Sequence, residues 1–132
     1  MKIITGKQER YQKVVVYGPE GIGKSTFAAQ FPNPLFIDTE ASTAHMDVAR
    51  LERPTSWAVL MEYVQELTKD HQGFTTLVID TIDWAEQLCV QHICSKYQAS
   101  GIEDIGYGKG YVYEKEEFGR LLNKLQDLIE SG

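Results

Sequence analysis

The most informative part of this sequence is Gly18-Pro19-Glu20-Gly21-Ile22-Gly23-Lys24-Ser25, which is followed directly by Thr26. It matches the pattern G-x-x-x-x-G-K-[ST] at every fixed position. Glycines let such a loop adopt conformations closed to other residues, and its backbone N–H groups converge on phosphate oxygens. In this pattern Lys24 reaches the β- and γ-phosphates of a nucleotide, and the hydroxyl of Ser25 binds Mg²⁺. The stretch, with Glu20 turned to solvent, therefore predicts a loop that binds ATP and Mg²⁺.

The residues on either side of this loop predict the structural context that the pattern requires. Residues 14–17 read Val-Val-Val-Tyr, and such a continuous β-branched run is typical of a strand buried on both faces of a parallel sheet. Residues 24–31 have the pattern of a helix, which Pro32 and Pro34 end. A strand before the loop and a helix after it are expected of a phosphate-binding loop.

Further apolar runs alternate with helical patterns along the rest of the chain. We expect strands at residues 35–38 and 75–80, a small strand at 2–5, and a loop over 39–54. Helices are expected after the N-cap Ser56, after Asp80, and over residues 113–130. Both tryptophans, Trp57 and Trp84, are expected in the core. The helix stripes expected to be buried are Trp57, Leu60, Met61, Val64 and Leu67; Ala85, Leu88, Cys89, His92 and Ile93; and Phe118, Leu121, Leu122, Leu125, Leu128 and Ile129.

This alternation predicts an α/β fold of three layers, with a mostly parallel central sheet flanked by helices. Length favours one nucleotide-binding domain over residues 1–132. The sequence ends where another buried strand is expected. We therefore interpret it as the N-terminal part of a longer domain.

Asp80 is the candidate for a second Mg²⁺ anchor. It ends the apolar run 77–79, and a carboxylate at the end of a strand beside a phosphate loop holds the metal, here through water. The alternative is that Asp80 caps the following helix, a role that Thr81 or Asp83 could fill equally well.

Glu40 is the candidate for orienting or deprotonating the attacking water. It follows the strand expected at 35–38, at the edge where the γ-phosphate would lie. Asp38, Thr81 and Asp83 are rival candidates, and Glu40 could instead be a solvated loop carboxylate. With Glu40, Lys24 completes the predicted catalytic pair.

Composition excludes several other classes of protein. No apolar run approaches the roughly 18 residues that a membrane helix needs, and the N-terminus lacks the apolar stretch of a signal peptide, so we expect a cytoplasmic protein. The net charge of −6 argues against a broad basic surface for duplex nucleic acid. Cys89 and Cys94 form a poor zinc site and are expected to be reduced cysteines near a packed helix face.

Four segments together resemble bacteriophage RecA-like nucleotide-binding ATPases of the AAA/RecA type, some of which act as single-strand annealing proteins. The segments are residues 16–28 around the phosphate loop, 36–40 (Phe-Ile-Asp-Thr-Glu), 78–84 (Val-Ile-Asp-Thr-Ile-Asp-Trp) and 106–111 (Gly-Tyr-Gly-Lys-Gly-Tyr). Their order and spacing also fit, so the resemblance covers nearly the whole chain. The phosphate loop is shared by a vast superfamily, whereas the combination of the four segments is much more specific.

The resemblance implies a catalytic glutamate at Glu40 and a magnesium aspartate at Asp80. It further implies homo-oligomeric rings or filaments with ATP between neighbours, action on single-stranded DNA in phage recombination or replication, and a place in the bacterial cytoplasm. The chain departs from the family in stopping before the strand whose polar end senses the γ-phosphate, and no arginine finger is evident. We therefore expect hydrolysis to need the missing C-terminal part or an oligomer.

Residues 106–111 place a lysine between two tyrosines among glycines. Tyr107 and Tyr111 could stack on bases of single-stranded DNA while Lys109 contacts phosphate. The segment could equally contact the nucleotide of a neighbouring subunit, or be a loop whose tyrosines pack on the domain. The residues alone leave these three interpretations open.

Two other functions share the phosphate loop. The chain could be a nucleotide-dependent switch or assembly module with little turnover, or a small-molecule or nucleotide kinase. Such kinases usually carry arginine-rich lids, whereas residues 101–113 contain no arginine. A GTPase is disfavoured because no Asn-Lys-x-Asp motif is present.

Overall fold

The computed structural model describes residues 1–132 and contains four α-helices and three β-strands. The helices are α1 (Lys24–Ala28), α2 (Trp57–Lys69), α3 (Ile82–Lys96) and α4 (Lys109–Glu130), and the strands are β1 (Pro34–Asp38), β2 (Ala49–Arg50) and β3 (Thr76–Asp80). Two short 3₁₀ turns, Ile102–Asp104 and Gly106–Gly108, connect α3 to α4. No helix combines the length and the apolarity needed to cross a membrane.

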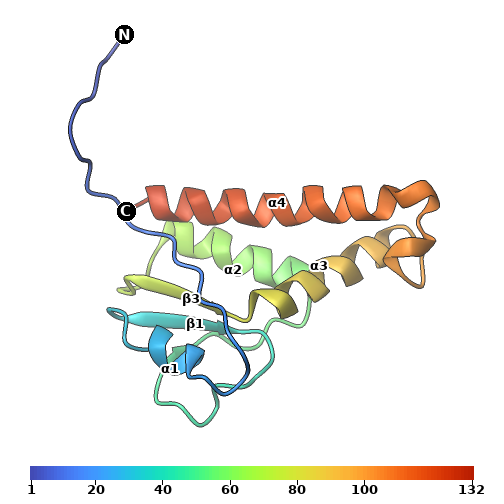
Figure 1. Cartoon of the computed structure of the whole chain (residues 1–132), viewed down its shortest axis with the longest axis horizontal. Coiled ribbons are helices and arrows are strands. Elements are labelled where there is room, and N and C mark those ends of the chain that lie inside the picture. Colours follow the sequence, from blue (N-terminus) through green and yellow to red (C-terminus); the bar gives the residue numbers. More distant parts are fainter.

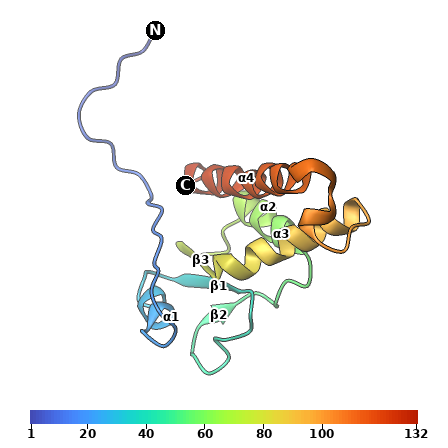
Figure 2. The same ribbon diagram turned by 45° about the vertical axis from the view of Figure 1, so that its right-hand side comes forward.

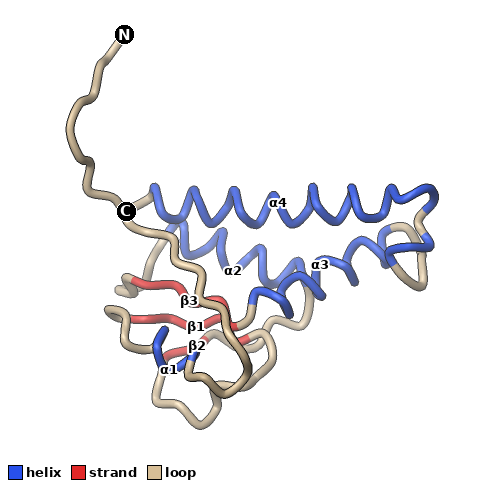
Figure 3. The backbone as a smooth tube through the Cα atoms, viewed as in Figure 1, coloured by secondary structure: helices blue, strands red, loops and turns tan.

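The three strands form one parallel sheet in the order β2-β1-β3 (Figure 3). The register of β1 and β3 pairs Pro34 with Thr76 at one end and Asp38 with Asp80 at the other. Because both strands run in the same direction, their two terminal aspartates lie at the same edge of the sheet. This edge carries the candidate site.

The helices lie on both sides of the sheet, as Figures 1 and 2 show. Helices α2 and α3 cover one face, α4 lies across them as an outer layer, and α1 lies on the opposite side of β1. The α/β fold with a parallel sheet flanked by helices is therefore confirmed. One core cluster joins β1 to three helices and consists of Ile37, Trp57, Leu60, Val64, Ala85, Cys89 and Leu121.

The helix stripes read from the sequence are largely confirmed. The side chain of Ser56 accepts a hydrogen bond from the backbone N–H of Val59 at 3.2 Å and so caps α2, as expected. The buried residues of α2 are Trp57, Leu60, Val64 and Leu67, and those of α3 are Ala85, Cys89 and Ile93. Cys89 is a core residue, and burial together with nearby glutamates raises the pKa of its thiol to about 12. Such a thiol stays protonated and unreactive at neutral pH.

Two predicted strands are wrong. Residues 2–5 and 14–17 have no regular secondary structure, and Val15 and Tyr17 are 82% and 91% exposed. A high β-propensity describes a side chain that fits a pleated, half-buried surface, and no neighbouring strand offers that surface here. The first residues instead extend away from the sheet (Figure 1), and Lys13 Nζ donates to Gln126 Oε1 of α4 at 2.6 Å.

Other boundaries and side chains also differ from the sequence-based expectation. The helix after the phosphate loop ends at Ala28 rather than residue 31, the expected loop 39–54 contains the short strand β2, and α4 begins at Lys109 rather than residue 113. The core placement of Trp84 and Leu122 is wrong, because these side chains are 48% and 51% exposed. Trp84 precedes the buried stripe of α3 by one position, and this rotates it by about 100° away from the core.

Candidate nucleotide-binding site

The predicted phosphate loop lies exposed between the N-terminal segment and α1. Gly21 and Gly23 have positive φ angles of 84° and 100°, which side chains other than glycine adopt only with strain. Lys24 folds back onto the loop, where its Nζ donates to the carbonyl oxygens of Gly18 and Pro19. Phosphate oxygens would offer this ammonium group stronger, charge-assisted hydrogen bonds at the same place.

Ser25 and Asp80 are brought together although 55 residues separate them in the sequence. Ser25 lies in the first turn of α1, and its Oγ donates a hydrogen bond to Oδ2 of Asp80 at the end of β3. Capping of α3 is performed by Thr81, whose Oγ1 accepts from the N–H of Trp84 at 3.3 Å. Asp80 therefore does not cap α3. A hydroxyl next to a carboxylate is the kind of oxygen pair that Mg²⁺ binds together with nucleotide phosphates.

Asp38 is fully engaged by the loop that follows β1. Its carboxylate accepts hydrogen bonds from Ser42 N at 3.0 Å, Thr43 N at 2.7 Å and Thr43 Oγ1. Burial raises the pKa of Asp38, but these hydrogen bonds to the ionised form outweigh it, so the pKa lies below its ordinary value of 3.8. Asp38 therefore shapes the loop that carries Glu40 and is a poor candidate for activating water.

The lowered pKa of Asp38 predicts a specific acid sensitivity. A carboxylate with a depressed folded-state pKa stabilises the fold fully above about pH 4, and this contribution is lost as the pH falls through the folded-state pKa. We expect Asp38→Asn to lower the free energy of unfolding at pH 7 by about 1–3 kcal/mol and to flatten its decrease below pH 4. Urea unfolding between pH 2 and 7 measures both effects, using values spaced by about one pH unit.

Asp47→Asn is the matched control for this experiment. Asp47 lies in the same loop but is exposed and accepts no hydrogen bond in the chain. Equal pH profiles for the two variants would contradict the role given to Asp38.

Glu40 lies in the turn after β1, at the same sheet edge as Asp80. It is half-buried, and its carboxylate makes no hydrogen bond or ion pair within the chain. A carboxylate without internal partners remains available to a ligand or a water molecule. Of the two carboxylates, Glu40 is therefore the one without hydrogen-bond partners in the chain, as its predicted role with a water molecule requires, whereas that of Asp38 is occupied.

Thr39 is a residue of this site that the sequence analysis did not single out. Its Oγ1 accepts from Thr81 N at 2.8 Å and donates to Thr81 O at 2.9 Å, and its N–H donates to Asp80 O at 2.8 Å. Its own carbonyl accepts from Arg53 Nε at 3.1 Å. A signal was present in the sequence, because residues 37–39 and 79–81 both read Ile-Asp-Thr, and Ile37 and Asp38 pair with Ile79 and Asp80 in the sheet. Thr39 fixes the ends of β1 and β3 to each other.

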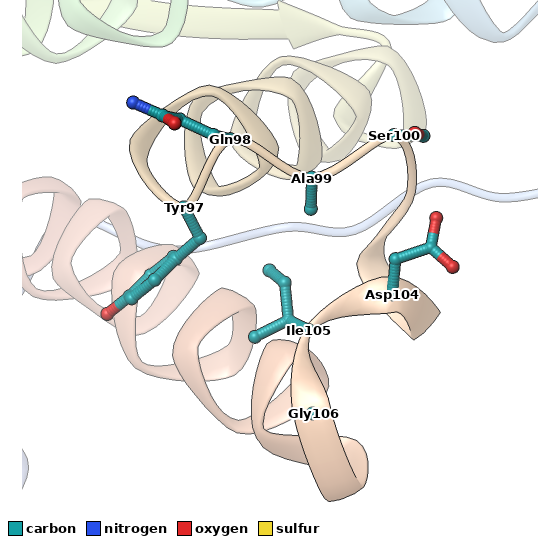
Figure 4. A pocket seen from close by; sticks show the side chains of 7 residues that line it. All are labelled: Tyr97, Gln98, Ala99, Ser100, Asp104, Ile105 and Gly106. Atoms are coloured by element: carbon teal, nitrogen blue, oxygen red, sulfur yellow. The ribbon is translucent and has the colours of Figure 1, made fainter.

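The predicted contacts at residues 106–111 lie far from the phosphate loop, at the opposite end of the molecule from α1 (Figure 1). Tyr107 is fully exposed with a positive φ of 56°, and Tyr111 is 57% exposed. The packing of these tyrosines on the domain, one of the three interpretations, is therefore wrong for Tyr107. Beside this segment is a cavity of about 360 Å³ lined by residues 97–100 and 104–106, with Tyr97 and Ile105 on its walls (Figure 4). It includes none of the residues of the phosphate loop.

Comparison with known proteins places this chain in a family. A family profile described as an AAA domain matches residues 10–131, which is nearly the whole chain. The chain belongs to the AAA domain family. AAA-type domains are nucleotide-binding ATPases, and the match thus agrees with the phosphate loop at residues 18–25.

This AAA domain is also similar to a prophage protein. It is 24% identical over 118 residues to the SPbeta prophage-derived uncharacterized protein YorG of Bacillus subtilis (strain 168). The match covers 85% of this chain and 36% of the relative, so the chain spans about a third of that protein's length. No solved structure matches the chain.

Proposed function

We propose that residues 1–132 form a nucleotide-binding domain, the N-terminal part of a longer RecA-like domain, which binds ATP with Mg²⁺. The observation that carries this proposal is the contact between Ser25 of the phosphate loop and Asp80 of β3. Two oxygen-bearing side chains from distant parts of the sequence meet beside a lysine that is held at the loop. Lys24 would then bind the phosphates, and Ser25 and Asp80 would hold the metal.

Different groups of this site would bind the phosphates and the metal. Backbone N–H groups of residues 20–26 would surround the phosphates, while Lys24 would exchange the carbonyls of Gly18 and Pro19 for β- and γ-phosphate oxygens. Ser25 and Asp80 fit a magnesium site because both offer hard oxygen ligands. When bound, Mg²⁺ neutralises negative charge on the β- and γ-phosphates.

Hydrolysis would use Glu40 at the same sheet edge. Glu40 accepts a proton from water as the water oxygen bonds to the γ-phosphorus, and the bond from this phosphorus to the bridging oxygen breaks. The products are ADP and inorganic phosphate. Thr39 positions Glu40 and Asp80 relative to each other through its hydrogen bonds to Asp80 and Thr81.

The wider role we propose is action on single-stranded DNA in phage recombination or replication, as a homo-oligomer. The prophage origin of the similar protein supports the setting. Tyr107, Lys109 and Tyr111 are candidate DNA contacts, because they are exposed at one end of the molecule. That end is remote from the chain's own phosphate loop (Figure 2), so a contact with nucleotide through these residues would involve a neighbouring subunit.

Glu40→Gln tests the proposed hydrolysis. We expect turnover of ATP to fall about 100-fold or more, since a general base typically contributes 10²–10⁴-fold, while ATP affinity changes by less than about 2-fold. Release of phosphate, with and without single-stranded DNA, measures the first effect, and calorimetric titration measures the second. Glu62→Gln, an exposed glutamate on α2, is the control and should leave both unchanged.

The same assays separate the alternative functions. Binding of ATP by the wild-type chain without turnover, with or without DNA, would favour a nucleotide-dependent switch. Transfer of phosphate from ATP to a nucleotide or small molecule instead of water would favour a kinase.

A further inference from the structure

A second cavity, of about 320 Å³, opens at the carboxyl edge of the sheet beside the end of β1. Its volume lies at the lower end of the range of small-molecule sites, and open α/β sheets bind ligands at this edge. The walls come from the end of β1, from the segment before α2 and from one face of α3. The residues that matter for recognition are Thr39, Arg53, Trp84, Gln87 and Gln91.

Trp84 gives this cavity an aromatic wall. Its side chain is 48% exposed and its indole N–H donates no hydrogen bond within the chain, whereas Trp57 is 2% exposed and donates to Glu117 at 2.8 Å. A half-exposed indole on the wall of a cavity is a stacking surface for a planar ligand, such as a nucleobase.

The polar groups of the cavity are free to bind a ligand. Arg53 uses its Nε for the carbonyl of Thr39, which leaves both terminal nitrogens of the guanidinium without a partner in the chain. The side-chain amides of Gln87 and Gln91 make no hydrogen bond within the chain, and each can donate to and accept from the edge of a base. No carboxylate lines the cavity, so its lining carries one positive charge in a chain of net charge −6.

We propose that this cavity binds a nucleobase that carries a phosphate group, with the base stacked on Trp84 and the phosphate held by Arg53. Single-stranded nucleic acid and a free nucleotide both present this chemistry. The site is distinct from the phosphate loop. The proposal depends on the proposed function in one respect: single-stranded DNA is the expected ligand only if the protein acts on DNA.

The cavity is linked to the magnesium aspartate through one residue. Arg53 donates to the carbonyl of Thr39, and the N–H of Thr39 donates to the carbonyl of Asp80. A ligand that moves Arg53 therefore acts on the strand ends that hold Asp80. Occupation of the cavity would thus alter magnesium and ATP binding at the neighbouring site.

Fluorescence of Trp84 tests the proposal directly, because the chain has two tryptophans and Trp57→Phe leaves Trp84 as the sole reporter. The titrations use the Lys24→Ala background, which disables the phosphate loop, and the probes are a short single-stranded oligothymidylate and AMP. We expect saturable quenching by the oligonucleotide, with an affinity about 10-fold lower in Arg53→Gln, as for the loss of one charged hydrogen bond. Arg10→Gln, a change in the exposed N-terminal segment, should have no effect.

A second measurement guards against a variant that fails to fold. Anisotropy of a labelled oligothymidylate is compared between the otherwise unchanged chain and Trp84→Ala, whose affinity should fall about 10-fold, the usual cost of losing one stacked base. Quenching by the oligonucleotide alone would identify a polynucleotide ligand, and quenching by AMP as well would extend the site to free nucleotides. Both results support the proposal.

Several results would overturn it. In the fluorescence titrations, these are a lack of saturable quenching with both probes, quenching by an acidic peptide but by neither probe, or quenching that Arg53→Gln leaves unchanged. In the anisotropy measurement, it is an oligonucleotide affinity that Trp84→Ala leaves unchanged. A chain that binds no ATP but keeps the Trp84 response would refute the proposed ATPase and leave this site standing.

Discussion

Gly110→Ala is expected to destabilise the fold by about 1–3 kcal/mol or more, the cost of overpacking a tight interior. Gly110 lies buried in the first turn of α4, against the turn Ile102–Asp104. A methyl group added there would lie 2.2 Å from the carbonyl oxygen of Ile102 and 3.0 Å from Cβ of Ile105. Because the first of these neighbours is backbone, it cannot be relieved by a side-chain rotation. Urea unfolding of the variant and the wild type measures the difference.

Gly119→Ala is a matched control with the opposite expected sign. Gly119 lies in the same helix, and a methyl group added there meets no atom within 4 Å. Alanine in a helix interior is about 0.8–1 kcal/mol more favourable than glycine, and this half-buried position has room for the methyl group, so the variant should be more stable than the wild type. Equal effects at the two positions would contradict the close approach of α4 to the preceding turn.

Lys24→Ala should weaken binding of Mg²⁺-ATP by about 50-fold or more, as expected for the loss of two hydrogen bonds from a charged donor. Lys24 is already held at the loop by the carbonyls of Gly18 and Pro19, and we propose that phosphate oxygens replace them. The fold should be unaffected, since the side chain makes no contact with the core cluster. Calorimetric titration with ATP measures the affinity, and circular dichroism checks the fold.

Lys115→Ala removes an equal charge from the exposed surface of α4 and serves as the control. Its affinity for Mg²⁺-ATP should match that of the wild type. If both lysine variants lost affinity to the same extent, a general electrostatic effect rather than the phosphate loop would explain the binding.

Local patterns predicted two of the three strands and the four helices, and missed only the two-residue strand β2. The runs 35–38 and 75–80 became β1 and β3 because each pairs with the other, and the stripe that begins at Trp57 is buried by the sheet and by α4. The run 14–17 has an equally strong β pattern but pairs with nothing. Its failure illustrates that strand propensity depends on neighbours, which a local pattern does not contain.

The candidate site was predicted in part. The spacing of the phosphate loop specified Lys24 and Ser25, and the end of an apolar run specified Asp80, which the structure places against Ser25. The engagement of Asp38 by the loop arises from tertiary hydrogen bonds that have no sequence pattern of their own. The bridging role of Thr39 was hinted at by the repeated Ile-Asp-Thr, but its hydrogen bonds to Thr81 depend on the pairing of β1 with β3. Trp84 was misplaced because it was assigned to the core as a tryptophan, although it lies outside the periodic stripe of α3 and in fact lines a cavity.

The magnesium dependence of ATP affinity tests the central claim most directly. Calorimetric titrations with ATP are run on the wild-type chain and on Asp80→Asn, each with Mg²⁺ and with a chelator. We predict that Mg²⁺ strengthens binding to the wild type by about 10-fold or more, as for one additional charged contact, and that Asp80→Asn loses this gain. Absence of ATP binding by the wild type, or an equal gain from Mg²⁺ in both proteins, would contradict the assignment of Ser25 and Asp80 as the metal-binding pair beside the phosphate loop.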